Sequence, residues 1–234
     1  MGRESWDTFL RIVEKHAPYD SLLCPSDFVE GRGDKSGGTE LLTTSVFGQV
    51  EIFVDVLKQI RPFFRSKGPI PLELVFGTSY HTAFGGEDWE DVLACHKDLR
   101  MYSIPKPGAH TWVKSGGVTF DLKHHVGRSA TPYGQWTPLA RAMVWNSLWN
   151  MKKGQPLADV LIRGHVHYHI AAIQGKRLAV TAPCLSWGSK FGSRRCDEEI
   201  DWGILWFDCE NGAYEWGSEL VVLEAMKPKV RILR

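Results

Sequence analysis

Two histidines follow the end of an apolar segment in the second half of the chain. The residues from Asp159 to Ile162 are typical of a buried strand, and Gly164 lets the chain turn sharply after it. His165 and His167 come next, one residue apart, so that their imidazoles could reach two neighbouring metal positions. The same spacing would also place two ordinary strand histidines on one face, and this alternative stays open.

An aspartate and a second histidine pair follow two further apolar segments. The strand predicted from Gly117 to Leu122 runs on into His124 and His125, and either of them could be a metal ligand. Asp27 follows the apolar segment from Ser21 to Cys24, and a carboxylate at a strand end can bridge two divalent ions. An aspartate here could instead cap a turn.

A fourth apolar segment, Pro71 to Phe76, ends at Gly77 and is followed by His81. Strand ends that deliver Asp27, His81, the pair at 124–125 and the segment 164–167 in this order resemble the calcineurin-like metallophosphoesterase superfamily, over about residues 20–183. The segments 27–31 and 77–81 are similar to its phage and prophage branch, with Thr78 where most members have an asparagine.

The resemblance implies an α/β fold, a four-layer α/β/β/α sandwich with mixed sheets, formed by residues 1–234 as a single domain. Asp27 is similar to the ligand that bridges two metals, His165 and either His124 or His125 to ligands of one metal, and His167 to a ligand of the other. His81 corresponds either to a ligand or to the proton donor for the leaving group. One or two divalent ions per chain are implied, Mn²⁺ or Zn²⁺ first and Mg²⁺, Fe²⁺ or Ni²⁺ as alternatives.

The activity that the resemblance implies is hydrolysis of phosphate esters through a metal-activated water, with phosphodiesters and nucleic acid as the favoured substrates. Lys35, Arg128 and Arg163 lie close in sequence to the candidate metal ligands, and their positive charges could hold substrate phosphates. Equally, they could be solvated surface charges.

The family's opening Asp-x-His motif, which its first strand carries, is absent from this sequence. Either this strand is missing, or another chain supplies the motif, or one metal position is impaired. Threonine at position 78 is also a weaker ligand than asparagine. Two alternatives to an enzyme follow. The first is a catalytically impaired relic that binds one metal or a partner. The second is a structural zinc site formed by Asp27, His124, His165 and His167, which ranks last because structural zinc prefers cysteine.

The elements that would position these residues alternate between helix and strand, which indicates a layered α/β fold. Apolar residues at helical spacing predict helices around residues 6–13, 50–63, 88–99 and 138–151. Further strands are expected at 177–181 and from Ile204 onward, including 220–223. Four glycines between Glu30 and Glu40 indicate a loop.

The composition narrows the class of protein. With 234 residues, 28 basic and 27 acidic side chains and a net charge of +1, the chain is not a nucleic-acid binder that acts through net charge, although a local basic groove is allowed. Five widely spaced cysteines indicate reduced thiols and a cytoplasmic location. The sequence predicts no signal peptide and no membrane span, and we therefore expect no membrane partner. Association of two chains through an unpaired sheet edge is a hypothesis.

Overall fold

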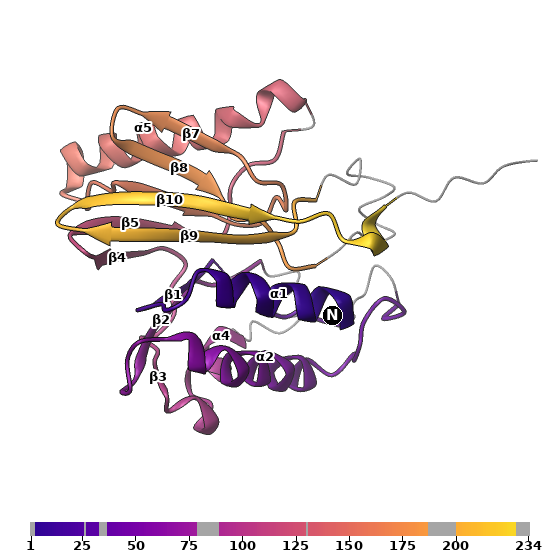
Figure 1. The fold of residues 1–234 in the computed structure, drawn as a ribbon. Coiled ribbons are helices and arrows are strands. Elements are labelled where there is room, and N and C mark those ends of the chain that lie inside the picture. Colours follow the sequence, from indigo (N-terminus) through magenta and orange to yellow (C-terminus); the bar gives the residue numbers. More distant parts are fainter. Residues whose placement is uncertain are drawn as a thin grey trace, which may run out of the picture.

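The computed structural model describes residues 3–25, 27–32, 37–78, 89–129, 131–186 and 200–227, which alternate between helices and strands (Figure 1). The helices in these residues are α1 (Arg3–Lys15), α2 (Val46–Ile60), α4 (Trp89–Ala94) and α5 (Trp136–Lys153). The strands are β1 (Leu22–Cys24), β2 (Ile70–Leu74), β3 (Tyr102–Ser103), β4 (Thr111–Ser115), β5 (Val118–Lys123), β6 (Val160–Arg163), β7 (Ala171–Gln174), β8 (Arg177–Thr181), β9 (Gly203–Glu210) and β10 (Ala213–Leu220). Short 3-10 turns lie at Arg61–Phe63, Lys97–Leu99, Pro132–Gly134 and Glu224–Met226.

The strands form two main sheets and a hairpin. One sheet has the order β4-β5-β6-β8-β7, in which β5, β6 and β8 are parallel and the outer strands β4 and β7 are antiparallel to their neighbours. The other sheet is parallel, with the order β1-β2-β3. Strands β9 and β10 form an antiparallel hairpin. The five-stranded sheet is therefore mixed, as expected, whereas the three-stranded sheet is parallel throughout.

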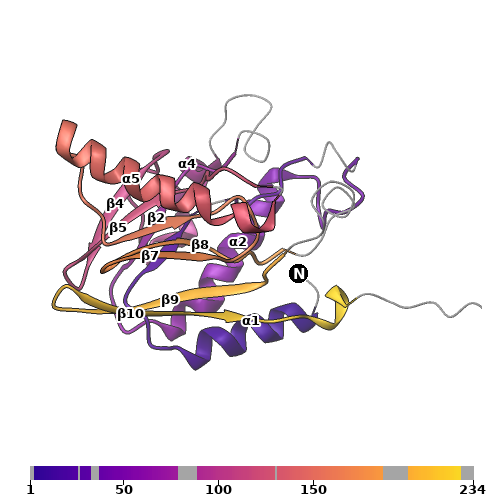
Figure 2. The same cartoon turned by 90° about the horizontal axis from the view of Figure 1, so that it is seen from above.

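Apolar residues gather in three cores, and each core lies between two layers. The first fills the space between α5 and the five-stranded sheet, the second lies between that sheet and the layer containing β1, β2 and the hairpin, and the third packs that layer against α1, α2 and α4. Figures 1 and 2 show the resulting stack, with α5 on one outside and α1 and α2 on the other. The four-layer α/β/β/α sandwich is thus confirmed.

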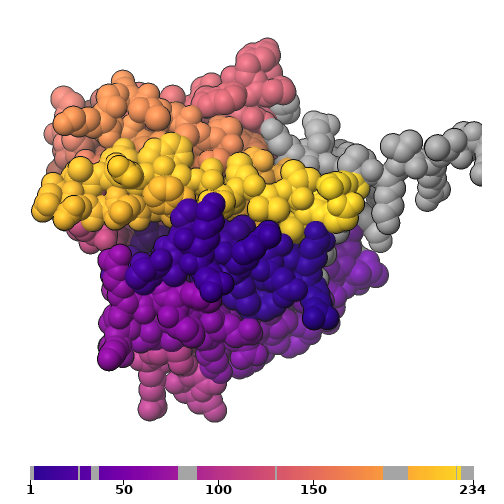
Figure 3. Space-filling model, in the orientation of Figure 1, coloured from indigo at the N-terminus to yellow at the C-terminus, as the bar shows by residue number. Residues whose placement is uncertain are grey.

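The hairpin belongs to the second sheet layer because its side chains alternate between two cores. Leu205 and Phe207 pack on the five-stranded sheet, where Phe207 meets Phe120 edge-on at a ring distance of 5.2 Å. Ile204 packs toward the helices instead, and Trp206 stacks on His16 at the end of α1. In the space-filling view the yellow hairpin accordingly lies between the indigo α1 and the orange β7–β8 region (Figure 3).

Helix α5 connects β5 to β6, and its own sequence fixes its end and its orientation. Leu139, Met143 and Asn146 are buried against the sheet. Gly154 takes the left-handed conformation (φ 67°) after the last turn and donates its N–H to the Asn150 carbonyl, which is how a helix ends at a glycine. Because β5 and β6 are parallel neighbours, α5 runs antiparallel to both, and its first turn lies at the edge where the two strands end.

Some predicted boundaries are wrong. The segment 221–223 is not a strand, because β10 ends at Leu220, and the helix expected over 88–99 splits into α4 and a 3-10 turn at Lys97–Leu99. None of the described helices has the length and the apolar character needed to cross a membrane.

Candidate metal centre

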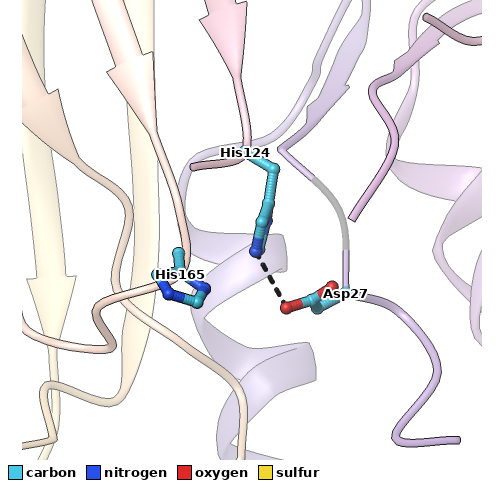
Figure 4. Close-up of side chains that lie close together, drawn as sticks. All are labelled: Asp27, His124 and His165. Atoms are coloured by element: carbon cyan, nitrogen blue, oxygen red, sulfur yellow. Dashed lines mark ion pairs between the residues drawn. The ribbon is translucent and has the colours of Figure 1, made fainter. Parts of the chain in front are cut away.

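Three predicted ligands come together where strands of the two facing sheets end. His124 directly follows β5, His165 follows Gly164 after β6, and Asp27 lies three residues beyond the end of β1. Each residue offers one ligand atom, and these atoms all lie within 4.8 Å of one another. Figure 4 shows the two imidazoles and the carboxylate pointing toward one another. A carboxylate and two imidazoles are a donor set suited to a divalent transition metal.

The hydrogen bonds of His124 define which of its nitrogens is available. Nδ1 lies 2.7 Å from the Pro25 carbonyl oxygen, which can only accept, so Nδ1 carries a proton and donates it. Nε2 is buried and lies 2.9 Å from Oδ2 of Asp27, yet it makes no hydrogen bond of good geometry with any described residue. Metal-ligating histidines usually donate one ring N–H to a backbone carbonyl or a carboxylate, as Nδ1 of His124 does, which leaves the other nitrogen for the metal.

The two histidines have shifted pKa values in opposite directions. Burial alone would lower the pKa of His124, but its contact with the Asp27 carboxylate, the charge of that carboxylate and the Pro25 carbonyl together raise it. Burial, followed by the neighbouring positive charges of His124 and His125, lowers the pKa of His165 to about 4. His165 is therefore neutral at neutral pH, and one of its ring nitrogens carries a lone pair. The residues present thus fit a divalent cation, which would take the place of the proton between His124 and Asp27.

The turn that follows β2 also holds the Asp27 carboxylate. The Thr78 N–H donates to Oδ1 of Asp27 at 2.9 Å, and the Thr78 hydroxyl lies 3.5 Å from Oδ2. A Cβ on Gly77 would collide with Oδ1 of Asp27, so only glycine allows this approach. The buried Glu90 of α4 accepts the Gly77 N–H at 2.9 Å and fixes the turn.

The backbone at the site is strained. Asp27, His165 and His167 have φ angles of 58°, 73° and 66°, in the left-handed region that few residues other than glycine, asparagine, aspartate and histidine adopt. Gly164 also lies close to the site, because a Cβ there would be 3.1 Å from Nδ1 of His124. Left-handed residues that gather in one place are characteristic of functional sites.

The other predicted site residues do not join this group. His125 and His167 are exposed, although the ring of His125 lies 4.8 Å from that of His165. Of the two neighbours, His124 is therefore the one that the structure places with Asp27 and His165. A zinc site formed by all four of Asp27, His124, His165 and His167 is not assembled in the described residues.

The predicted phosphate-binding side chains have different fates. Arg128 is exposed. Arg163 is 5% exposed and pairs with Asp121 beneath α5, so the expectation that it could hold a substrate phosphate is wrong. Its place within β6 explains this, because alternate residues of the strand face α5. Lys35 and His81 lie outside the described residues.

Asp121 is the centre of a second buried polar cluster, on the α5 side of the five-stranded sheet. Its Oδ1 lies 2.7 Å from Nη1 of Arg163 and 2.9 Å from Nε2 of His110, and Asn146 approaches Oδ2 at 3.5 Å. Burial would raise the pKa of Asp121, but the contact with His110 and the charge of Arg163 lower it overall. This carboxylate already has its cation.

Sequence patterns missed two parts of the candidate metal centre. The Pro25 carbonyl is a backbone group, so its role cannot be predicted from the residue type. Glu90 lies in the predicted helix over 88–99, where nothing local distinguishes a buried acid from an exposed one. Only the contact with the Gly77 turn, thirteen residues earlier, reveals its function.

No model of a known protein family matches the chain, and no curated protein matches it in sequence. Solved structures do resemble it. Vps29 from Entamoeba histolytica in complex with Zn²⁺ is 13% identical, with 73% of this chain and 88% of that chain covered and a TM-score of 0.36. A novel archaeal phosphodiesterase is 13% identical, with 93% and 92% covered and a TM-score of 0.46. A predicted phosphoesterase from Streptococcus pneumoniae is 12% identical, with 74% and 92% covered and a TM-score of 0.34. The function is therefore inferred from the side chains of the site.

Proposed function

We propose that this chain is a metal-dependent phosphoesterase that cleaves phosphodiesters, with Asp27, His124 and His165 as ligands of a divalent ion, Mn²⁺ or Zn²⁺. The observation that carries the proposal is the state of His124. Its Nδ1 proton is committed to the Pro25 carbonyl, while its buried Nε2 faces a carboxylate at 2.9 Å. Two groups that both offer lone pairs at this distance need a cation between them, either a proton or a metal ion.

The chain's own residues supply the setting for phosphate chemistry. A bound divalent ion would act as a Lewis acid on a phosphoryl oxygen and activate water. Asp27 lowers the positive charge of the centre, and the Thr78 N–H keeps its carboxylate oriented. His125 is exposed beside His165, where it can donate a hydrogen bond to a substrate phosphate. Lys35 and Arg128 as phosphate-binding residues, His81 as ligand or proton donor and His167 as ligand of a second ion remain predictions.

Metal content and turnover measured on the same sample test the proposal. The protein is loaded with Mn²⁺ or Zn²⁺, freed of excess metal and assayed by mass spectrometry for bound ions and with bis-nitrophenyl phosphate for hydrolysis. We expect about one ion per chain and turnover that His165→Ala abolishes. His96→Ala is the matched control, because His96 pairs with Glu51 on α2 instead of joining the metal group. Hydrolysis that persists in His165→Ala, or in the presence of a chelator, would overturn the proposal.

The second candidate is a domain that binds a metal ion without catalysis. The absence of an Asp-x-His motif favours it, together with a group of three ligands in the described residues where a binuclear centre needs more. A stoichiometric metal with no hydrolysis of any phosphoester would select this candidate over the enzyme.

A further inference from the structure

The outer face of α5 exposes an unusual number of apolar side chains. Residues at helical spacing along this face include Val144 and Trp145, about half exposed at 53% and 48%, and Met151, 82% exposed. Trp145 stacks on Trp149, one turn further along, with a ring distance of 5.8 Å. Just before the helix Tyr133 is 86% exposed. Exposed aromatic residues gathered on one face indicate a binding surface.

The same part of the chain is strongly basic, which the net charge conceals. Residues 122–196 contain eleven lysines and arginines against a single acid, Asp159, while the rest of the chain contains 17 basic and 26 acidic residues. Asp159 is half-buried and accepts a hydrogen bond from the Thr119 N–H. Among the described residues of this segment, exposed lysines and arginines lie at 123, 128, 141, 152, 153 and 176, and no acidic side chain is exposed. A polyanion is therefore the partner that this surface complements.

The aromatic and basic face begins next to the candidate metal centre. Val126, two residues after His124, packs in the same core as Leu139 in the first turn of α5. A Cβ on Gly127 would lie 3.9 Å from the ring of Pro138. From this edge the 18 residues of α5 extend away across the sheet for about 27 Å (Figure 2). A long molecule that lies on α5 can thus reach the candidate metal centre with one end.

We propose that the outer face of α5 binds single-stranded nucleic acid and guides it to the candidate metal centre. This inference rests on the proposed function, since it names the phosphodiester that the centre would cleave. Bases stack on exposed aromatic rings, and lysines and arginines neutralise phosphates, which together bind single strands with little sequence preference. Arg141 and Lys152 lie within the exposed apolar stripe, at helical spacing from Trp145 and Leu148. A membrane-surface helix would keep its charges on the opposite face.

Binding is measured by fluorescence anisotropy of a labelled oligothymidylate in the presence of a chelator, so that no metal is bound and no cleavage occurs. The variant Arg141→Glu/Lys152→Glu reverses two charges of the α5 face. The matched control Arg11→Glu/Lys67→Glu reverses two exposed charges in the other half of the molecule. Circular dichroism and thermal unfolding verify that both variants fold.

We expect the α5 variant to bind the oligonucleotide at least about tenfold more weakly. The slope of the logarithm of the binding constant against the logarithm of the salt concentration should become shallower by about 0.7 for each lost phosphate contact. Trp145→Ala is expected to weaken binding about tenfold without changing the salt dependence. The control should bind like the unmodified chain. Equal weakening in the α5 variant and the control would overturn the proposal, as would no binding of the oligonucleotide at all.

Vesicles with anionic headgroups form the second arm of the test. Binding to these vesicles but not to oligothymidylate would identify the face as a membrane surface and overturn the inference. Because binding is measured without metal, it stands apart from hydrolysis of bis-nitrophenyl phosphate. Oligonucleotide binding without hydrolysis would refute the proposed phosphoesterase activity but not the proposed binding surface on α5. Hydrolysis without oligonucleotide binding would refute only the binding surface.

Discussion

Two aspartates in this molecule, Asp121 and Asp27, each lie 2.9 Å from a histidine, but the negative charges of the two carboxylates are balanced in different ways. Asp121 also contacts the guanidinium of Arg163 at 2.7 Å, so its charge is balanced by the protein itself. Asp27 faces His124, whose second nitrogen is already committed to a backbone carbonyl. The cation of the first pair is a fixed arginine, whereas the cation of the second is exchangeable, a proton or a metal ion.

The backbone around the two aspartates also differs. Asp121 lies within β5 and Arg163 within β6, two strands in regular parallel register. Asp27 and His165 lie just beyond their strands, and both have left-handed φ angles. A position within regular strands suits the ion pair between Asp121 and Arg163, which stabilises the sheet. A position in loops next to strand ends suits the candidate metal centre, where a cation must enter and leave.

The largest effect is expected from breaking the balanced pair. Asp121→Asn leaves the charge of Arg163 buried without a counter-charge, and arginine cannot lose its proton. We expect a loss of about 3–5 kcal/mol in the free energy of unfolding, measured with urea in the presence of a chelator. Asp121→Leu combined with Arg163→Met should recover most of this loss. A smaller loss for Asp121→Asn than for Asp27→Asn would contradict the comparison.

The matching change at the other pair should affect metal binding more than stability. Asp27→Asn removes a ligand, so we expect the affinity for Mn²⁺ or Zn²⁺ to fall by at least about 100-fold. Without metal the free energy of unfolding should change by no more than about 1 kcal/mol, because His124 can lose its proton where Arg163 cannot. Isothermal titration calorimetry and urea unfolding measure the two quantities. Asp20→Asn, in an exposed pair with Arg65, is the control and should retain full affinity.

The support of Asp27 can be tested without touching a ligand. Gly77→Ala places a methyl group against the Asp27 carboxylate, and we expect it to lower stability by about 1–3 kcal/mol and metal affinity by about 10- to 100-fold. Gly68→Ala is a suitable control, because a Cβ there meets nothing closer than 3.6 Å. Normal affinity in Gly77→Ala would mean that the turn after β2 does not position the carboxylate.

The two pairs should respond to pH at opposite ends of the scale. The pKa of His124 is raised on folding, so its stabilising contribution in the metal-free protein is complete below about pH 6.5 and is lost as the pH rises through the folded pKa. The pKa of Asp121 is lowered, so its contribution is complete above about pH 4 and is lost as the pH falls further. Unfolding of His124→Ala and Asp121→Asn, measured across pH 3–9 beside the unmodified chain, should show the two differences in separate windows.

The smallest effect is expected from His125. Because His125 is exposed and lies outside the group of three, His125→Ala should leave metal affinity unchanged, while His124→Ala should abolish it. Calorimetry with the same metal compares the two neighbours directly. The opposite result would exchange their roles and break the comparison between the pairs.

Much of the fold could be predicted because its central elements have strong patterns. The apolar strand predicted over 177–181 coincides with β8, and the helix predicted over 138–151 lies within α5. Strands β4 and β7 escaped prediction because they are sheet edges, where few side chains are buried and alternation is weak. The strand predicted over 220–223 is wrong although Val221 and Val222 are typical strand residues, because in the described residues the pairing of β10 with β9 ends at Leu220.

The candidate site could be predicted in part. Asp27, His124 and His165 follow strand ends, and strand ends meet in a layered α/β fold, so that residue type and position indicated these candidates. Their roles as ligands came from the family resemblance. The choice between His124 and His125 could not be made, because it depends on which side chain faces the Pro25 carbonyl. The assignment of Arg163 failed because sequence proximity to His165 does not reveal that its side chain points toward Asp121 beneath α5.

The left-handed backbone at Asp27, His165 and His167 has a consequence for how this protein would respond to selection. Each of these residues adopts a conformation that costs an ordinary side chain about 1–2 kcal/mol and costs glycine almost nothing. A library of variants selected only for resistance to heat should therefore enrich glycine at these positions. At Asp27 and His165, stability and metal binding would favour different residues. Retention of these two residues under such selection would measure how strongly the bound ion stabilises the fold.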